Sequence, residues 1–129
     1  MILVIDDDKA VQASLSLLLN QTGYQVSVIS HPREAFRFVE TETPELVVLD
    51  MNFSNDTSGQ EGLFYLEKLK SKIPAVPFIL LTAWASIPLA KKKKKKGAFD
   101  FISKPWDNRA FVQTIRTAIN LQSHQKDTF

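Results

Sequence analysis

The chain has 129 residues, of which 44% are hydrophobic and 23% charged, as expected for one globular domain with a single core. It contains no cysteine, which excludes a disulfide framework, a thiolate zinc site and a cysteine nucleophile, and no apolar stretch approaches membrane-spanning length. The formal net charge of +2 is no argument for nucleic-acid binding, because without the six lysines at 91–96 the remaining 10 basic and 14 acidic side chains leave −4.

Apolar runs typical of buried strands alternate along the chain with segments whose apolar residues recur at helical spacing. In chain order, the expected strands lie at residues 2–5, 24–29, 46–49, 78–81 and 99–103. A helix is expected after each of them. This alternation predicts an α/β fold: a doubly wound, flavodoxin-like parallel sheet of five strands in the order 2-1-3-4-5, flanked by five helices. We expect one domain over residues 1–129, which could be a fragment of a longer protein.

Local signals predict where the helices begin and end. Asp8 suits the N-cap of the first helix, which should stop near Gly23. Pro32 suits the first turn of the second helix, and the third should end before Pro74. Ser86 can cap the fourth helix.

Three carboxylates, Asp6, Asp7 and Asp8, directly follow the first strand, which is apolar at every position. Such a strand lies inside a parallel sheet, and the ligands of these sheets sit beyond the carboxyl ends of the strands. Two unit charges about 4 Å apart repel by roughly 1–4 kcal/mol, so the cluster costs stability unless a cation sits in it. With Asp8 reserved for the helix cap, Asp6 and Asp7 are predicted to bind a metal.

Three other strand ends carry polar residues that would lie at the same edge of the sheet. Asp50 follows the third strand, Thr82 the fourth and Lys104 the fifth. Taken singly, Asp50 can be read as a turn-forming aspartate, Thr82 as a β-branched strand residue and Lys104 as a solvated surface lysine. Together with the acidic pair they suit phosphoryl transfer, which needs a nucleophilic oxygen, a divalent metal and groups that hold the phosphoryl oxygens.

Four segments resemble the receiver domains of two-component response regulators. They are ILVIDDD (2–8), VVLDMN (47–52), ILLTA (79–83) and GAFDFISKPW (97–106). Each lies at the end of an expected strand, they follow one another in the family's order, and the resemblance extends over nearly the whole chain. The last segment is most similar to receivers of the nitrogen-regulation type, whose full-length proteins often carry an ATPase and a DNA-binding module.

The resemblance implies that Asp50 is the phosphoacceptor and that Mg²⁺ is the cofactor. In the family, the metal binds the second acidic residue of the pair directly, here Asp7, and the first mainly through water, here Asp6. It also binds the phosphoacceptor carboxylate and the backbone carbonyl two residues on, here that of Asn52.

The same resemblance implies roles for three residues of the fourth and fifth strands. Thr82 and Lys104 would hold the phosphoryl oxygens, and Phe101 occupies the position of the family's rotameric aromatic switch. In the family, the peptide bond between the lysine and the following proline, here Pro105, is cis. The cis form costs little free energy only because a proline follows.

These roles describe a phosphorylation-activated signalling module, not an enzyme. Its implied partner is a histidine kinase or a phosphotransfer protein, with a homodimer forming through the last two helices. DNA would be reached only through an output domain outside this chain, no membrane contact is expected, and the expected location is the cytoplasm.

Two stretches depart from the family pattern. Residues 55–58 look like an insertion in the loop after Asp50, and the run Lys91–Lys96 places lysine where a packed helix needs apolar residues. The run reads either as a patch for an anionic partner or as an artificial stretch, and the artificial reading is favoured.

Three alternative functions stay open. A Mg²⁺-dependent phosphohydrolase with Asp50 as nucleophile would want an aspartate where Asn52 stands, because an amide cannot serve as general acid. A flavin or nucleotide carrier would want a glycine-rich loop after the first strand, which is absent. A degenerate receiver that acts as a binding module would have lost one of the acidic, threonine or lysine site residues, and none is lost.

Overall fold

The computed structural model describes residues 1–51, 60–83, 88 and 97–127. Four subjects of the sequence analysis lie outside these residues: Asn52, the insertion at 55–58, the lysine run at 91–96 and, apart from residue 88, the helix expected from Ser86.

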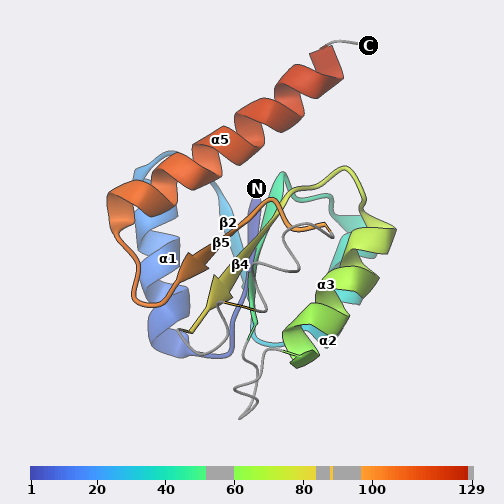
Figure 1. Cartoon of the computed structure of the whole chain (residues 1–129), viewed down its shortest axis with the longest axis horizontal. Helices are drawn as coiled ribbons and strands as arrows, with labels where there is room; N and C mark the ends of the chain where they lie inside the picture. The colour runs from blue at the N-terminus through green and yellow to red at the C-terminus, as the bar shows by residue number, and fades with distance from the viewer. Residues whose placement is uncertain (52–59, 84–87, 89–96, 128–129) are drawn as a thin grey trace.

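The described strands form one five-stranded parallel sheet in the order β2-β1-β3-β4-β5. The strands are β1 (Ile2–Ile5), β2 (Val26–Ile29), β3 (Leu46–Asp50), β4 (Phe78–Thr82) and β5 (Asp100–Ser103). Both the fold class and the strand order predicted from the sequence are confirmed. Because all five strands are parallel, their carboxyl ends meet at one edge, toward which the arrowheads of β4 and β5 point in Figure 1.

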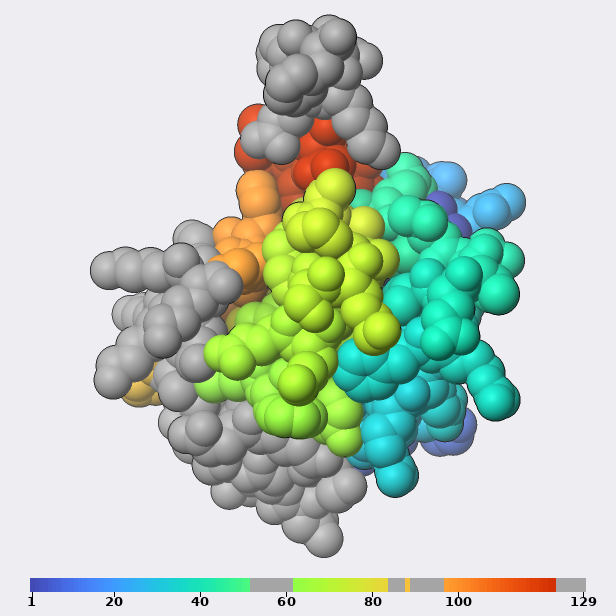
Figure 2. All heavy atoms as spheres, turned by 90° about the vertical axis from the view of Figure 1, so that its right-hand side faces the viewer, coloured from blue at the N-terminus to red at the C-terminus, as the bar shows by residue number. Residues whose placement is uncertain are grey.

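Helices cover both faces of the sheet (Figure 1). The described helices are α1 (Lys9–Gln21), α2 (Pro32–Thr41), α3 (Gln60–Lys72) and α5 (Asn108–Asp127). Helices α1 and α5 pack on one face, while α2 and α3 pack on the other and lie side by side in Figure 2. Among the described helices, none combines the length and the apolar character that a membrane span requires.

Side chains of the central strands alternate between the two faces and fill a separate core layer on each. The α2 and α3 face buries Leu3, Ile5, Val47, Leu49, Phe78 and Leu80. The α1 and α5 face buries Ile2, Val4, Leu46, Val48, Ile79 and Leu81. This burial on both sides explains why β1, β3 and β4 are apolar along almost their whole length.

The ends of α1 are formed by the residues that the sequence analysis assigned to them. The Asp8 side chain caps the helix by accepting hydrogen bonds from the backbone N–H groups of Ala10 (2.8 Å) and Val11 (3.2 Å). After the C-cap Thr22, Gly23 has a φ of 103°, a left-handed conformation that favours glycine.

A histidine caps the start of α2. His31 is half-buried, and its Nδ1 accepts a hydrogen bond from the Arg33 backbone N–H at 3.1 Å. Its ring also meets that of Tyr65 on α3 edge-on, with centroids 5.5 Å apart. Histidine is not among the common capping residues, so this role could not be predicted from the residue type.

Asp8→Ala is expected to lower the free energy of unfolding by about 1 kcal/mol, because two backbone donors of α1 lose their acceptor. Urea denaturation followed by circular dichroism measures this. Asp8→Asn is the matched control, since it removes the same charge but keeps a capping acceptor. Equal losses in the two variants would show that the charge of Asp8, and not its cap, stabilises the helix.

Candidate phosphoryl-transfer site

An acidic cluster lies at the carboxyl edge of the sheet. Asp6 and Asp7 follow β1 and Asp50 ends β3, and one carboxylate oxygen from each lies within 4.8 Å of the others. Asp6 and Asp50 are almost completely buried, with 0% and 1% of their surfaces exposed, while Asp7 is exposed. The structure thus brings together the three carboxylates that the sequence analysis singled out.

Lys104, which follows β5, joins the two buried carboxylates. Its Nζ lies 2.9 Å from Oδ2 of Asp6 and 3.2 Å from Oδ1 of Asp50. Burial alone lowers the pKa of Lys104, but the charge of Asp50 and the hydrogen bond and charge of Asp6 outweigh it and raise that pKa above 10.5. The ammonium therefore stays charged at neutral pH. Among the described residues of the site, three carboxylates and one ammonium give a formal charge of −2.

Neighbouring polar groups hold Asp6 in place. Its Oδ1 accepts a hydrogen bond from the Asp8 backbone N–H at 2.9 Å, and its carbonyl accepts one from Nε2 of Gln12 on α1. Gln12 also donates to Oγ of Ser30 at 3.2 Å, which ties the end of β2 to the site. The sequence analysis missed Gln12 and Ser30. The signal available for Gln12 was its polar side chain between the apolar positions Val11 and Leu15.

Thr82 ends β4 at the same edge and is fully buried. Its hydroxyl donates a hydrogen bond to the carbonyl of Ala83 at 3.1 Å. The Lys104 backbone N–H donates to the Thr82 carbonyl at 2.8 Å, which fixes the lysine beside the threonine. The peptide bond between Lys104 and Pro105 is cis, as the family resemblance implied.

Phe101 lies on β5 opposite Leu80 of β4. It is half-buried and packs against the core layer that faces α2 and α3. The remaining candidate ligand, Asn52, falls outside the described residues, so the structure places six of the seven predicted site residues: Asp6, Asp7, Asp50, Thr82, Phe101 and Lys104.

Gly62, in the first turn of α3, approaches the backbone directly after Asp50. A Cβ atom at Gly62 would lie 2.5 Å from Cα of Met51 and 2.6 Å from its carbonyl oxygen. Only a residue without a side chain lets α3 pack this closely. The sequence analysis did not single out Gly62, although a glycine inside a helical pattern is a recognised sign of close packing.

The residues of this edge fit a hard divalent cation such as Mg²⁺. Their donors are carboxylate oxygens, which Mg²⁺ prefers, and one ammonium offsets only part of their charge. Two of the carboxylates are buried while Asp7 is exposed, so the described cluster can be reached from solvent.

A protein-family model described as the response regulator receiver domain matches residues 2–116. The chain is 31% identical over 118 residues to the transcriptional regulatory protein ZraR of Escherichia coli (strain K12), which covers 92% of this chain and 26% of that protein. It is 27% identical over 123 residues to the DNA-binding transcriptional regulator NtrC of Klebsiella pneumoniae, which covers 95% of this chain and 25% of that protein. The chain thus spans about a quarter of the length of the curated relatives it matches.

Among solved structures, the chain resembles the N-terminal signal receiver domain of a two-component system response regulator from Bacteroides fragilis. The two are 39% identical and superimpose with a TM-score of 0.82, covering 92% of this chain and 94% of the other.

Proposed function

Because this chain belongs to the response regulator receiver domain family, we propose that it signals by accepting a phosphoryl group from a histidine kinase, or from a phosphotransfer protein, onto Asp50. One observation supports this assignment most directly. Asp50 is buried beside Asp6, and the Lys104 ammonium lies within 3.2 Å of both carboxylates. A carboxylate in this setting has a cation ready to pair with the phosphoryl oxygens that it would acquire.

In the proposed reaction, a carboxylate oxygen of Asp50 attacks the phosphorus of a phosphohistidine on the partner. The new bond joins oxygen to phosphorus, the phosphorus–nitrogen bond breaks, and the imidazole leaves with the electron pair and takes up a proton. The product is an acyl phosphate. Asp6, Asp7, Asp50 and the carbonyl of Asn52 would hold Mg²⁺, which when bound neutralises charge on the phosphoryl oxygens.

Lys104 and Thr82 would then bind the phosphoryl oxygens. Lys104 needs little movement, because its Nζ already lies 3.2 Å from Oδ1 of Asp50. Thr82 must first give up the hydrogen bond that its hydroxyl donates to Ala83. We propose that this exchange moves Thr82 inward and that Phe101, at present half-buried on the neighbouring strand, turns inward after it.

The wider role of the domain is part of the same proposal. Residues 1–129 would form a single receiver domain of a longer cytoplasmic regulator, whose output domain binds DNA. The last two helices and the strand between them would form the output surface and carry a homodimer. The transcription regulators among its relatives support this role.

We propose a phosphoacceptor and not a phosphohydrolase. The position two residues after Asp50 is Asn52, whose amide cannot donate and recover a proton as a carboxylic acid does. The only turnover proposed for this chain is its own phosphorylation from a donor and its own dephosphorylation.

Incubation with Mg²⁺ and acetyl phosphate tests the proposed function. The intact mass should increase by one phosphoryl group, and hydroxylamine should remove it, because hydroxylamine cleaves an acyl phosphate but not a phosphoserine. Chelation of Mg²⁺ should prevent the labelling. No added mass, or a label that survives hydroxylamine, would refute the proposal.

Mg²⁺ is expected to stabilise the folded domain. A ligand that binds only the folded state adds about 2.7 kcal/mol at a hundredfold excess over its Kd, which corresponds to a rise in Tm on the order of 10 °C. Asp7→Asn should largely abolish the shift and raise the Tm measured without metal, because one of three crowded charges is removed. Differential scanning calorimetry measures both effects.

Asp8→Asn is the matched control for this Mg²⁺ experiment. It removes a neighbouring charge from a residue that caps α1 and is not part of the acidic cluster, so it should keep the full Mg²⁺ shift. An equal shift in the wild type and Asp7→Asn would place the metal elsewhere.

A further inference from the structure

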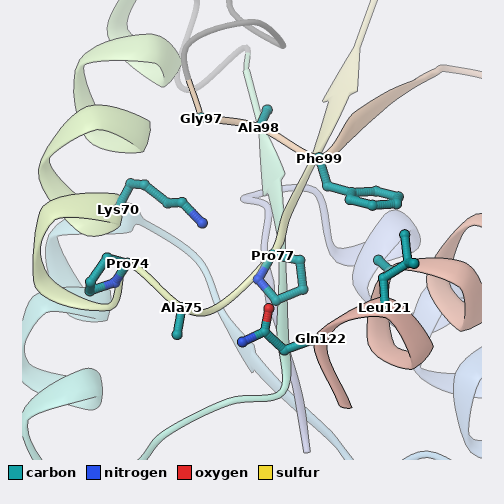
Figure 3. A pocket seen from close by; sticks show the side chains of 10 residues that line it. Lys70, Pro74, Ala75, Pro77, Gly97, Ala98, Phe99, Leu121 and Gln122 are labelled. Carbon is teal, nitrogen blue, oxygen red and sulfur yellow. The ribbon is translucent and has the colours of Figure 1, made fainter. Parts of the chain in front are cut away.

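A pocket lies at the amino edge of the sheet, opposite the edge that carries the acidic cluster. It opens between the end of α3, the segments that lead into β4 and β5, and the later part of α5 (Figure 3), and its volume is about 560 Å³. Figure 2 shows the end of α3, the segment from residue 97 and α5 meeting at this part of the surface. The volume lies in the range of ordinary small-molecule sites.

The described lining of this pocket is mostly apolar. Phe99 and Leu121 lie on one side and Pro74 and Ala75 on the other (Figure 3), and Pro77 and Ala118 also line the pocket. Leu121 keeps 48% of its surface exposed. Two polar side chains, those of Lys70 and Gln122, also line the pocket.

Lys70 sets the chemistry of the pocket. Its side chain extends from α3 into the pocket (Figure 3). Its Nζ donates a hydrogen bond to the Val76 carbonyl at 2.6 Å and lies 5.5 Å from the centre of the Phe78 ring. An ammonium group has three donors, and that of Lys70 makes one hydrogen bond to the described residues. In the described part of the chain, no carboxylate forms an ion pair with it.

A half-buried ammonium that forms no ion pair with a described carboxylate favours an anionic ligand. Burial lowers the pKa of Lys70, as expected for a cation partly removed from water and not compensated by an acidic neighbour. The apolar lining favours a ligand whose remaining surface is hydrophobic.

We infer that this pocket binds a small apolar carboxylate, with its charged group paired to the Lys70 ammonium and its hydrocarbon or aromatic part against Phe99 and Leu121. The Gln122 amide, which also lines the pocket, can donate a second hydrogen bond to the carboxylate. Apolar walls with a few polar groups that fix orientation are the usual composition of such a site.

This inference does not depend on the proposed phosphorylation of Asp50. The pocket and the acidic cluster lie at opposite ends of β4, whose five residues span roughly 17 Å. They share none of their described residues, so each can fail while the other stands.

Titration of the ¹⁵N-labelled protein with 2-naphthoate tests the inference. Saturable shifts are expected at the amides of Gly97, Ala98, Leu121 and Gln122. Lys70→Met should weaken binding about tenfold or more, because it removes the charge-assisted hydrogen bond and keeps an apolar side chain of similar length. Lys70→Arg should retain binding within a few fold.

Two matched controls separate a specific charge pair from general attraction. Lys72→Met removes an exposed lysine from the last turn of the same helix, outside the pocket lining, and should leave binding unchanged. Neutral 2-naphthamide should bind more weakly than 2-naphthoate, and Lys70→Met should not affect it.

Two results would overturn the inference: the absence of saturable shifts at the pocket amides, or 2-naphthoate binding that Lys70→Met leaves unchanged in a variant with the wild-type fold. Asp50→Asn should bind 2-naphthoate as the wild type does, which keeps this test independent of the phosphorylation test.

Discussion

Asp50→Asn is expected to abolish labelling by acetyl phosphate, without loss of the fold. The amide has nearly the size of the carboxylate but no nucleophilic oxygen, so no acyl phosphate can form. The fold should survive because Lys104 keeps its ion pair with Asp6 at 2.9 Å and one of two buried negative charges is removed. Intact-mass measurement gives the labelling, and thermal denaturation gives the stability.

Asp107→Asn is the matched control for this substitution. Asp107 is exposed, and its Oδ1 accepts a hydrogen bond from the Arg109 backbone N–H at 3.1 Å, a contact that asparagine can preserve. This variant should be labelled as fast as the wild type. If Asp50→Asn is still labelled at the wild-type rate, the phosphoacceptor is another residue.

Lys104→Ala distinguishes the attack of Asp50 on the phosphodonor from the conformational response that follows phosphorylation. The Asp50 carboxylate remains, so some labelling should persist, but the phosphoryl oxygens lose their charged partner. The shift of the Phe101 amide resonance on phosphorylation should therefore be smaller than in the wild type. A full shift in this variant would show that Lys104 does not couple phosphorylation to the strand.

The fold could be predicted because its main determinants are local in the sequence. Strands β1, β3 and β4 are buried on both sides, and this requirement is visible as unbroken apolar runs. The cap at Asp8 and the turn at Gly23 depend on one or two residues each. Parallel strands then place Asp6, Asp50 and Thr82 at one edge without any further information.

What the sequence did not reveal depends on contacts between distant segments. The capping role of His31 goes with a ring contact to Tyr65 on another helix, and the link from Gln12 to Ser30 joins α1 to the end of β2. Neither histidine nor glutamine has a local structural preference strong enough to predict these contacts.

Gly62→Ala should lower the free energy of unfolding by about 1–3 kcal/mol, because Gly62 closely approaches the backbone of Met51. In an exposed helix the same change stabilises by about 1 kcal/mol, because alanine is the better helix former. Here the added methyl group would lie 2.5 Å from Cα of Met51. The atoms that it meets belong to the backbone and cannot rotate away, so α3 or the chain after Asp50 must move.

Urea denaturation at constant m-value measures the loss of stability in Gly62→Ala. Ala13→Gly, at an exposed position of α1, is the matched control, because it measures the helix preference in the opposite direction and should cost up to about 1 kcal/mol. Labelling of Gly62→Ala by acetyl phosphate should also be slower, since Met51 directly follows Asp50, the proposed phosphoacceptor. A Gly62→Ala variant as stable as the wild type would show that α3 shifts freely, and unchanged labelling would show that its position does not influence Asp50.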